Sequence, residues 1–165
     1  MVSIPIFISI IVPAISVVTA LNPVFATAEH IKAVVYGVVS LKGIDKNLCY
    51  WYSVYAIVDN DKKADENIVY IGMTNCPVRR LTEHRNSDRF KHSNIDMFVL
   101  ITGLEKHIAR VIEQTIISAF TLNALKNLIN SIAAGKRVAE EFERVGNWFD
   151  CLAEEGLNDL GPWPW

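Results

Sequence analysis

The chain contains 165 residues, which is the size of one ordinary domain or of one small domain with an appendage. Its contents of 51% apolar and 21% charged residues exclude an intrinsically disordered polymer. The net charge of −2 excludes a protein that is basic over its whole surface, but nucleic-acid binding needs only a local basic face. Three scattered cysteines are too few for a disulfide scaffold or for a zinc site of the C-x-x-C type.

The N-terminal segment from Met1 to Ala28 has no ionisable side chain and is long enough to span a bilayer. Three interpretations compete: a cleaved signal peptide, a membrane-inserted helix, and an apolar helix packed in the protein or against a partner. The triplet Ala26-Thr27-Ala28 favours a signal peptide, whereas the lack of a preceding basic residue and the two prolines, Pro5 and Pro13, count against it. We expect a membrane-associated or exported protein, or a cytoplasmic one if residues 1–28 form a packed helix.

Two further segments flank the central part of the chain. Residues 31–41 are apolar but too short to span a bilayer, and they could pair with the first segment as a helical hairpin. Residues 136–165 carry seven acidic and three basic side chains, and their apolar residues recur at helical spacing: Val138, Phe142, Val145 and Phe149. We divide the chain into an apolar N-terminal segment (1–44), a central module (45–135) and an acidic C-terminal helix and tail (136–165). Both flanking helices are expected to lie outside the core of the module.

The central module contains three segments that are typical of β-strands. Residues 50–58 and 68–72 are rich in aromatic and β-branched side chains and are joined by a polar loop, which predicts an antiparallel hairpin. Residues 95–101 predict a third strand. The two-residue period of a strand places Tyr55 and Tyr70 on the same side of the hairpin.

Two helices are predicted within this module. Asn75 and Pro77 are suited to cap and to start a helix that continues over residues 78–84. Residues 104–120 are apolar around most of the helix, which predicts burial and makes Glu113 conspicuous, because an unpaired buried carboxylate is costly. With residues 126–132 closing the module, the order of elements predicts an α+β fold with a small three-stranded antiparallel sheet flanked by helices.

Residues 50–132 resemble the module of GIY-YIG endonucleases, similar to those of bacterial excision repair and of polymorphic-toxin C-terminal domains. The resemblance is carried by Tyr55 in Ser-Val-Tyr-Ala-Ile, by Tyr70-Ile71-Gly72, by Arg80 and His84 on the following helix, by Glu113 in Ile-Glu-Gln, and by Leu125-Lys126-Asn127. The sequence departs from the family pattern in two places, because Ser53 replaces the first glycine and the hairpin loop is somewhat long.

The resemblance implies hydrolysis of phosphodiester bonds in DNA, or in RNA, with Mg²⁺ or Mn²⁺ as the cofactor. It implies that Glu113 binds the metal and that Tyr55 or Tyr70 is the general base. A single carboxylate fits a one-metal site, because Mg²⁺ commonly uses one or two protein carboxylates with water and substrate oxygens. The forked guanidinium of Arg80 suits a phosphate. The residues expected to be catalytic are Tyr55, Tyr70, Arg80, His84, Glu113 and Asn127.

A local excess of positive charge could bind the substrate. The stretch from Arg79 to His92 has five basic residues and two acidic ones, so it could follow a phosphate backbone. The residues expected to bind nucleic acid are Arg79, Arg85, Arg89 and Lys91. His107 matches no position of the family motif.

Three functions of different classes remain open: a metal-dependent endonuclease, a catalytically inactive GIY-YIG-like nucleic-acid-binding module, and a membrane-associated structural protein. The presence of both tyrosines together with Arg80, His84 and Glu113 favours the endonuclease. An apolar leader before a small nuclease resembles the C-terminal ends of secreted bacterial toxins. A toxin effector, membrane contact through residues 1–28, and an immunity or inhibitor protein as partner are therefore further expectations.

Overall fold

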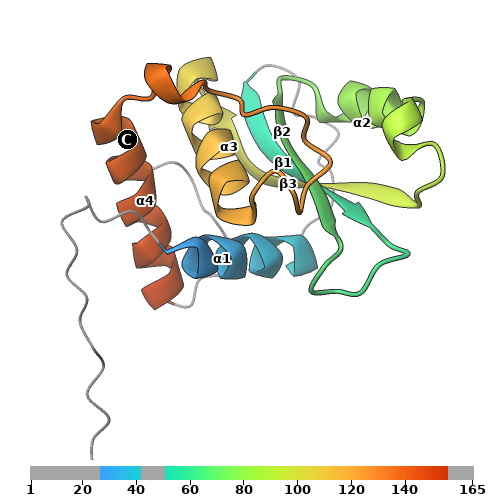
Figure 1. The fold of residues 1–165 in the computed structure, drawn as a ribbon, viewed down its shortest axis with the longest axis horizontal. Coiled ribbons are helices and arrows are strands. Elements are labelled where there is room, and N and C mark those ends of the chain that lie inside the picture. Colours follow the sequence, from blue (N-terminus) through green and yellow to red (C-terminus); the bar gives the residue numbers. More distant parts are fainter. Residues whose placement is uncertain (1–26, 42–50, 156–165) are drawn as a thin grey trace, which may run out of the picture.

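A computed structural model describes residues 27–41 and 51–155 of the chain (Figure 1). The elements follow in the order α1 (Ala28–Leu41), β1 (Tyr52–Asp59), β2 (Ile68–Thr74), α2 (Pro77–Arg85), η1 (Asp88–Phe90), β3 (Ile95–Leu104), α3 (Lys106–Phe120), η2 (Ala134–Lys136) and α4 (Ala139–Glu154). Nearly all of the N-terminal segment for which a signal peptide, membrane helix or helical hairpin is predicted lies outside the described residues. Among residues 27–41 and 51–155, no helix has the length and hydropathy needed to cross a bilayer.

The three strands form one antiparallel sheet in the order β2-β1-β3, as the sequence predicts. The central strand β1 pairs with β2 so that Tyr55 lies opposite Gly72 and Ile57 lies opposite Tyr70. Side chains alternate between the faces of a strand, so Tyr55 and Tyr70 lie diagonally on the same face of the hairpin. The predicted α+β architecture and the common face of the two tyrosines are confirmed.

The sheet has an apolar core on each of its faces. Helices α1, α3 and α4 lie together on one side, and α2 with η1 lies on the other (Figure 1). The first core contains Val54 and Ala56 of β1, which pack with the apolar residues of the three helices. The second, smaller core surrounds Tyr55 and contains Leu81 of α2 and Phe90 of η1. The sheet face that carries the tyrosines is therefore the one covered by α2 and η1.

The expectation that the flanking helices lie outside the core is wrong. Their buried side chains belong to the same core cluster as those of α3: Ile31, Val34, Val35, Val38 and Val39 of α1, and Phe142, Val145, Trp148, Phe149 and Leu152 of α4. The flanking helices join this core because α3 is apolar on several sides. Such a helix must be covered by other elements besides the sheet, and α1 and α4 provide that cover. Val138, which the helical spacing groups with Phe142, Val145 and Phe149, is not buried with them. It is the N-cap of α4 and is 52% exposed.

Candidate active site

Two tyrosines and a histidine form a compact aromatic cluster on the face of the sheet covered by α2. The hydroxyl of Tyr55 lies 2.8 Å from Nε2 of His84, and both side chains are buried. The ring centre of Tyr70 is 4.9 Å from that of the His84 imidazole and 6.2 Å from that of Tyr55. The fold thus brings together three of the residues that the sequence analysis singled out.

Gly72 makes room for this cluster. It lies opposite Tyr55 in the ladder, and a Cβ at this position would be 2.6 Å from Cζ of Tyr55 and 2.7 Å from a ring carbon of Tyr70. Both distances are far below van der Waals contact, so any other residue would push the two rings aside. The glycine of the Tyr70-Ile71-Gly72 motif is required because both tyrosine rings lie over it.

Ser53 occupies the position where the family has its first glycine, and its surroundings explain why a serine is accepted. The side chain is fully buried at 0% exposure, and its Oγ is 3.0 Å from Oγ1 of Thr102 on β3. A small residue is therefore needed at this point, and the buried hydroxyl has the hydrogen-bond partner that its burial demands. The departure from the family pattern leaves the tyrosine cluster intact.

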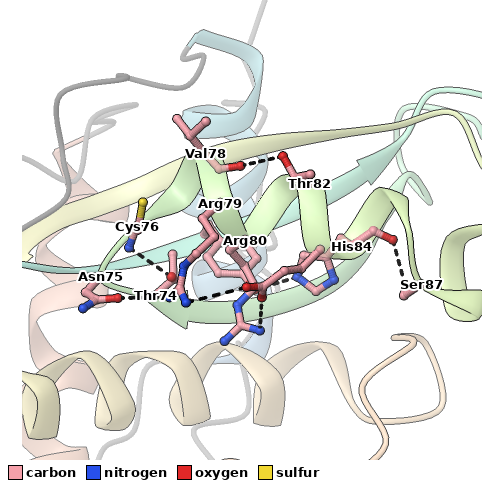
Figure 2. Close-up of polar contacts among 11 residues, drawn as sticks. Thr74, Asn75, Cys76, Val78, Arg79, Arg80, Thr82, His84 and Ser87 are labelled. Atoms are coloured by element: carbon pink, nitrogen blue, oxygen red, sulfur yellow. Dashed lines mark hydrogen bonds and ion pairs between the residues drawn. The ribbon is translucent and has the colours of Figure 1, made fainter.

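Helix α2 carries Arg80 and His84 one turn apart (Figure 2). The imidazole of His84 contacts both tyrosines. Pro77 begins the helix as predicted, but the N-cap is Cys76, without a side-chain capping bond, and not Asn75. Asn75 instead accepts a hydrogen bond from Arg79, which also lies 3.7 Å from Glu83. Arg79 thus faces solvent, whereas Arg80 acts electrostatically on Tyr55, Tyr70, His84 and Glu113.

The guanidinium of Arg80 is only partly satisfied by the protein. Its Nη1 donates to Glu83 at 2.8 Å, but its Nε is buried and has no hydrogen-bond acceptor among the described residues. A buried donor without an acceptor is costly and usually has a functional explanation. An oxygen of a bound phosphate would satisfy this donor and place its negative charge among the site residues.

Glu113 reaches the site from α3, and its side chain is 8% exposed. Ser131 donates a hydrogen bond to its carboxylate, and so does the backbone N–H of Met73 on β2. Burial raises the pKa of Glu113, while Ser131, Arg110, Met73 and Arg80 act in the opposite direction. Ser131 was not among the predicted site residues, because no spacing in the sequence connects it with a carboxylate 18 positions earlier.

The donor set around Glu113 decides which kind of metal site is feasible. The described residues include no group of three or more His, Cys, Asp or Glu side chains that could together hold a metal ion. The described residues therefore contain no site with the several protein ligands that zinc requires. A cation that retains most of its water ligands can be bound by one carboxylate. Glu113 fits Mg²⁺ or Mn²⁺ on these terms, and its role as a metal ligand stays a prediction.

The environment of the cluster keeps His84 neutral. Burial, followed by the nearby charges of Arg80 and Arg89, lowers the pKa of His84 to about 4. Burial also raises the pKa of Tyr55 and of Tyr70, although Arg80 lowers both and Arg89 lowers that of Tyr70. In the protein alone the effect of burial outweighs that of the arginines, so the pKa of each tyrosine is above its usual value. The neutral imidazole can accept a hydrogen bond from the hydroxyl of Tyr55 at Nε2.

The predicted nucleic-acid-binding residues differ in their availability. Arg89 lies 5.4 Å from the centre of the Tyr70 ring and therefore borders the site. Lys91 is exposed to solvent. Arg85 forms an ion pair with Asp96 at 3.0 Å and donates to the backbone of Ile95, so part of its charge is already compensated.

The side chain of Asn127 forms two hydrogen bonds with the backbone of the edge strand β2. Its Nδ2 donates to the carbonyl of Ile71 at 2.7 Å, and its Oδ1 accepts from the N–H of Ile71 at 3.1 Å. The preceding N–H, of Lys126, donates to the carbonyl of Val69. Both polar atoms of the Asn127 side chain therefore bond the strand that carries Tyr70, and the catalytic role expected of Asn127 stays a prediction.

Comparison with known proteins identifies one family. The model of the GIY-YIG catalytic domain matches residues 51–120, which include both tyrosines, α2 and Glu113. No curated protein and no solved structure matches the chain.

Proposed function

Since residues 51–120 belong to the GIY-YIG catalytic domain family, which supports nuclease function in general terms, we propose that the protein is a divalent-metal-dependent endonuclease. Its substrate would be DNA or RNA, with DNA as the first candidate. The observation that carries the proposal is the convergence of the Tyr55–His84 pair, Tyr70, Arg80 and Glu113 from four separate elements. A catalytically inactive binding module would not need to keep all of these groups together.

The proton needed for hydrolysis can be moved by the Tyr55–His84 pair. In the tautomer with the proton on Nδ1, the neutral His84 accepts a hydrogen bond from Tyr55 at Nε2. Tyr55 can then take a proton from the attacking water while its own proton passes to His84. The phenol does not have to exist as a free phenolate, so its raised pKa does not prevent it from acting as general base.

Positive charge for the phosphate would come from the protein and from the metal. The partly exposed guanidinium of Arg80, whose Nε has no acceptor among the described residues, would donate to a phosphate oxygen. Arg80 also lies close enough to both tyrosines to influence their pKa values. A metal ion on Glu113 would polarise the scissile phosphate as a Lewis acid. Arg89 and Lys91 would hold the backbone beside the reacting group.

The test uses the full chain with labelled DNA and RNA of equal sequence, in the presence of Mg²⁺, Mn²⁺ or EDTA. We expect cleavage with either metal and none with EDTA. The matched variants are Glu113→Gln, which removes the buried carboxylate, and Glu143→Gln, which removes an exposed carboxylate on α4. Loss of cleavage in the first variant only would support the proposal, and metal-independent cleavage would contradict it.

The biological setting rests on the residues that precede the fold. We propose that residues 1–28 act in export or membrane association, and that a toxin role with an inhibitor protein as partner is the setting to test first. The support is the uncharged apolar sequence of that segment.

A further inference from the structure

A second surface with basic residues lies beside Glu113, and none of its lining residues belongs to the predicted Arg79–His92 stretch. It is a hollow of about 920 Å³ between the first turns of α3, the loop at residues 130–133, η2 and the start of α4. Its basic residues are Lys106, Arg110 and Lys136, all of which are exposed, together with His107. The acidic residues Glu105 and Glu141 also line it, and Glu105 lies 3.4 Å from His107.

Two residues that line the hollow, Arg110 and Ser131, connect it to Glu113 of the candidate active site. Lys106, Arg110 and Glu113 are spaced by four and three residues along α3, so they form one stripe on this helix. Arg110 acts electrostatically on the carboxylate of Glu113, and Ser131, in the wall of the hollow, donates a hydrogen bond to that carboxylate. A chain of phosphates that passes Glu113 can therefore continue directly over Arg110.

The hollow also contains residues that the family match does not include. Residues 130–133, Lys136 and Glu141 all follow residue 120, where the match ends. Lys136 is contributed by η2, which holds it across from the N-terminal turns of α3. This surface is thus a product of how the C-terminal part of this chain packs against α3.

We infer that the hollow binds the phosphate backbone of a nucleic acid next to the scissile phosphate, through Lys106, Arg110 and Lys136. The inference rests on the proposed nuclease function and adds to it a substrate requirement. The substrate is a polynucleotide that occupies both the Arg89–Lys91 side and the α3–η2 side of Glu113, so a mononucleotide would be bound poorly. Glu141 also lines the hollow, and its negative charge opposes this binding.

The experiment measures binding by fluorescence anisotropy of labelled DNA and RNA 20-mers over a range of salt concentrations, in EDTA so that no cleavage occurs. The test variant is Lys106→Ala/Lys136→Ala. The control is Lys62→Ala/Lys63→Ala, in the β1–β2 loop at the opposite end of the sheet from the start of α3. We expect the test variant to bind more weakly and to lower the salt slope by about 1 for each lost phosphate contact. We expect Glu141→Gln to bind more tightly and the control to match the wild type.

The outcomes separate this inference from the proposed function. If the wild type cleaves nucleic acid but the test variant binds as tightly as the control at every salt concentration, the hollow is not a binding surface and the nuclease proposal stands. If the test variant weakens binding but the wild type cleaves neither DNA nor RNA with any metal, the hollow is supported and the nuclease proposal fails. If the wild type neither binds nor cleaves, both are overturned.

Discussion

The hydroxyl of Tyr55 and the Nε2 of His84 are joined by a buried hydrogen bond of 2.8 Å, and His84 is held neutral. This contact couples the first strand of the hairpin to α2, and in the proposed mechanism it is the route for one proton. That route needs a neutral imidazole, because an imidazolium could not accept the proton of the phenol.

Replacement of Tyr55 by Phe tests this route. We expect Tyr55→Phe to fold, because the ring stays in its buried position, and to lose about 10²–10⁴-fold in the rate of cleavage. Single-turnover cleavage at saturating substrate measures the effect. Tyr52→Phe, on the same strand and partly exposed, is the matched control. An equal rate for Tyr55→Phe and the wild type would exclude Tyr55 as the general base and favour Tyr70.

The low pKa of His84 predicts how the stability of the protein depends on pH. The ordinary pKa is 6.5 and the folded value is about 4, so the unfolded chain binds more protons between these two values. The free energy of unfolding should therefore fall as the pH drops from 6.5 to 4. Urea unfolding of wild type and of His84→Gln over this range measures the difference, and His92→Gln, an exposed position, is the control. An unchanged slope in His84→Gln would contradict the buried neutral imidazole.

Arg80 and Arg79 should respond differently to substitution. Arg80→Lys keeps the charge but loses the forked donor, so we expect a loss of about 10²–10³-fold in the chemical step. Arg79 is turned toward Asn75 and Glu83, so Arg79→Ala should weaken binding at moderate salt and leave the rate at saturation nearly unchanged. Single-turnover kinetics of both variants make the comparison. A larger loss of rate in Arg79→Ala would mean that the wrong arginine has been placed in the site.

Gly72→Ala should damage the site through packing alone. The added Cβ would meet the rings of Tyr55 and Tyr70, and we expect a loss of about 1–3 kcal/mol in the free energy of unfolding together with a loss of cleavage. Gly135→Ala is the matched control, because a Cβ at that position has no atom within 4 Å. Equal denaturation midpoints for the two variants would show that the rings do not lie over Gly72 as described.

Truncation distinguishes the N-terminal segment from the helix that follows it. A chain that begins at Ala26 should fold, because it keeps α1 and Thr27, whose side chain and carbonyl accept hydrogen bonds from the first turn. A chain that begins at residue 45 loses five buried apolar side chains of α1, each contributing roughly 1.5–3 kcal/mol, and should not fold. Circular dichroism and thermal unfolding of both truncations give the answer, and a folded shorter chain would show that α1 is not part of the core.

The sequence by itself determined the elements whose signals are local. Aromatic and β-branched composition identified the three strands, the two-residue period of a strand gave the common face of Tyr55 and Tyr70, and Pro77 marked the start of α2. The spacing of Arg80 and His84 placed both on one face of that helix, and the apolar girth of α3 predicted that Glu113 is buried. These features depend on neighbours within a few residues, so periodicity and turn chemistry suffice to predict them.

Only the tertiary structure decided what those elements pack against. An apolar stripe shows that a face is buried but not which partner covers it, and for this reason α1 and α4 were misplaced outside the core that they share with α3. The hydrogen bond of Ser131 to Glu113, the bracing of Ile71 by Asn127 and the neutral state of His84 join residues far apart in the chain. Such contacts and the desolvation that accompanies them arise from the packing of whole elements, so no spacing in the sequence encodes them.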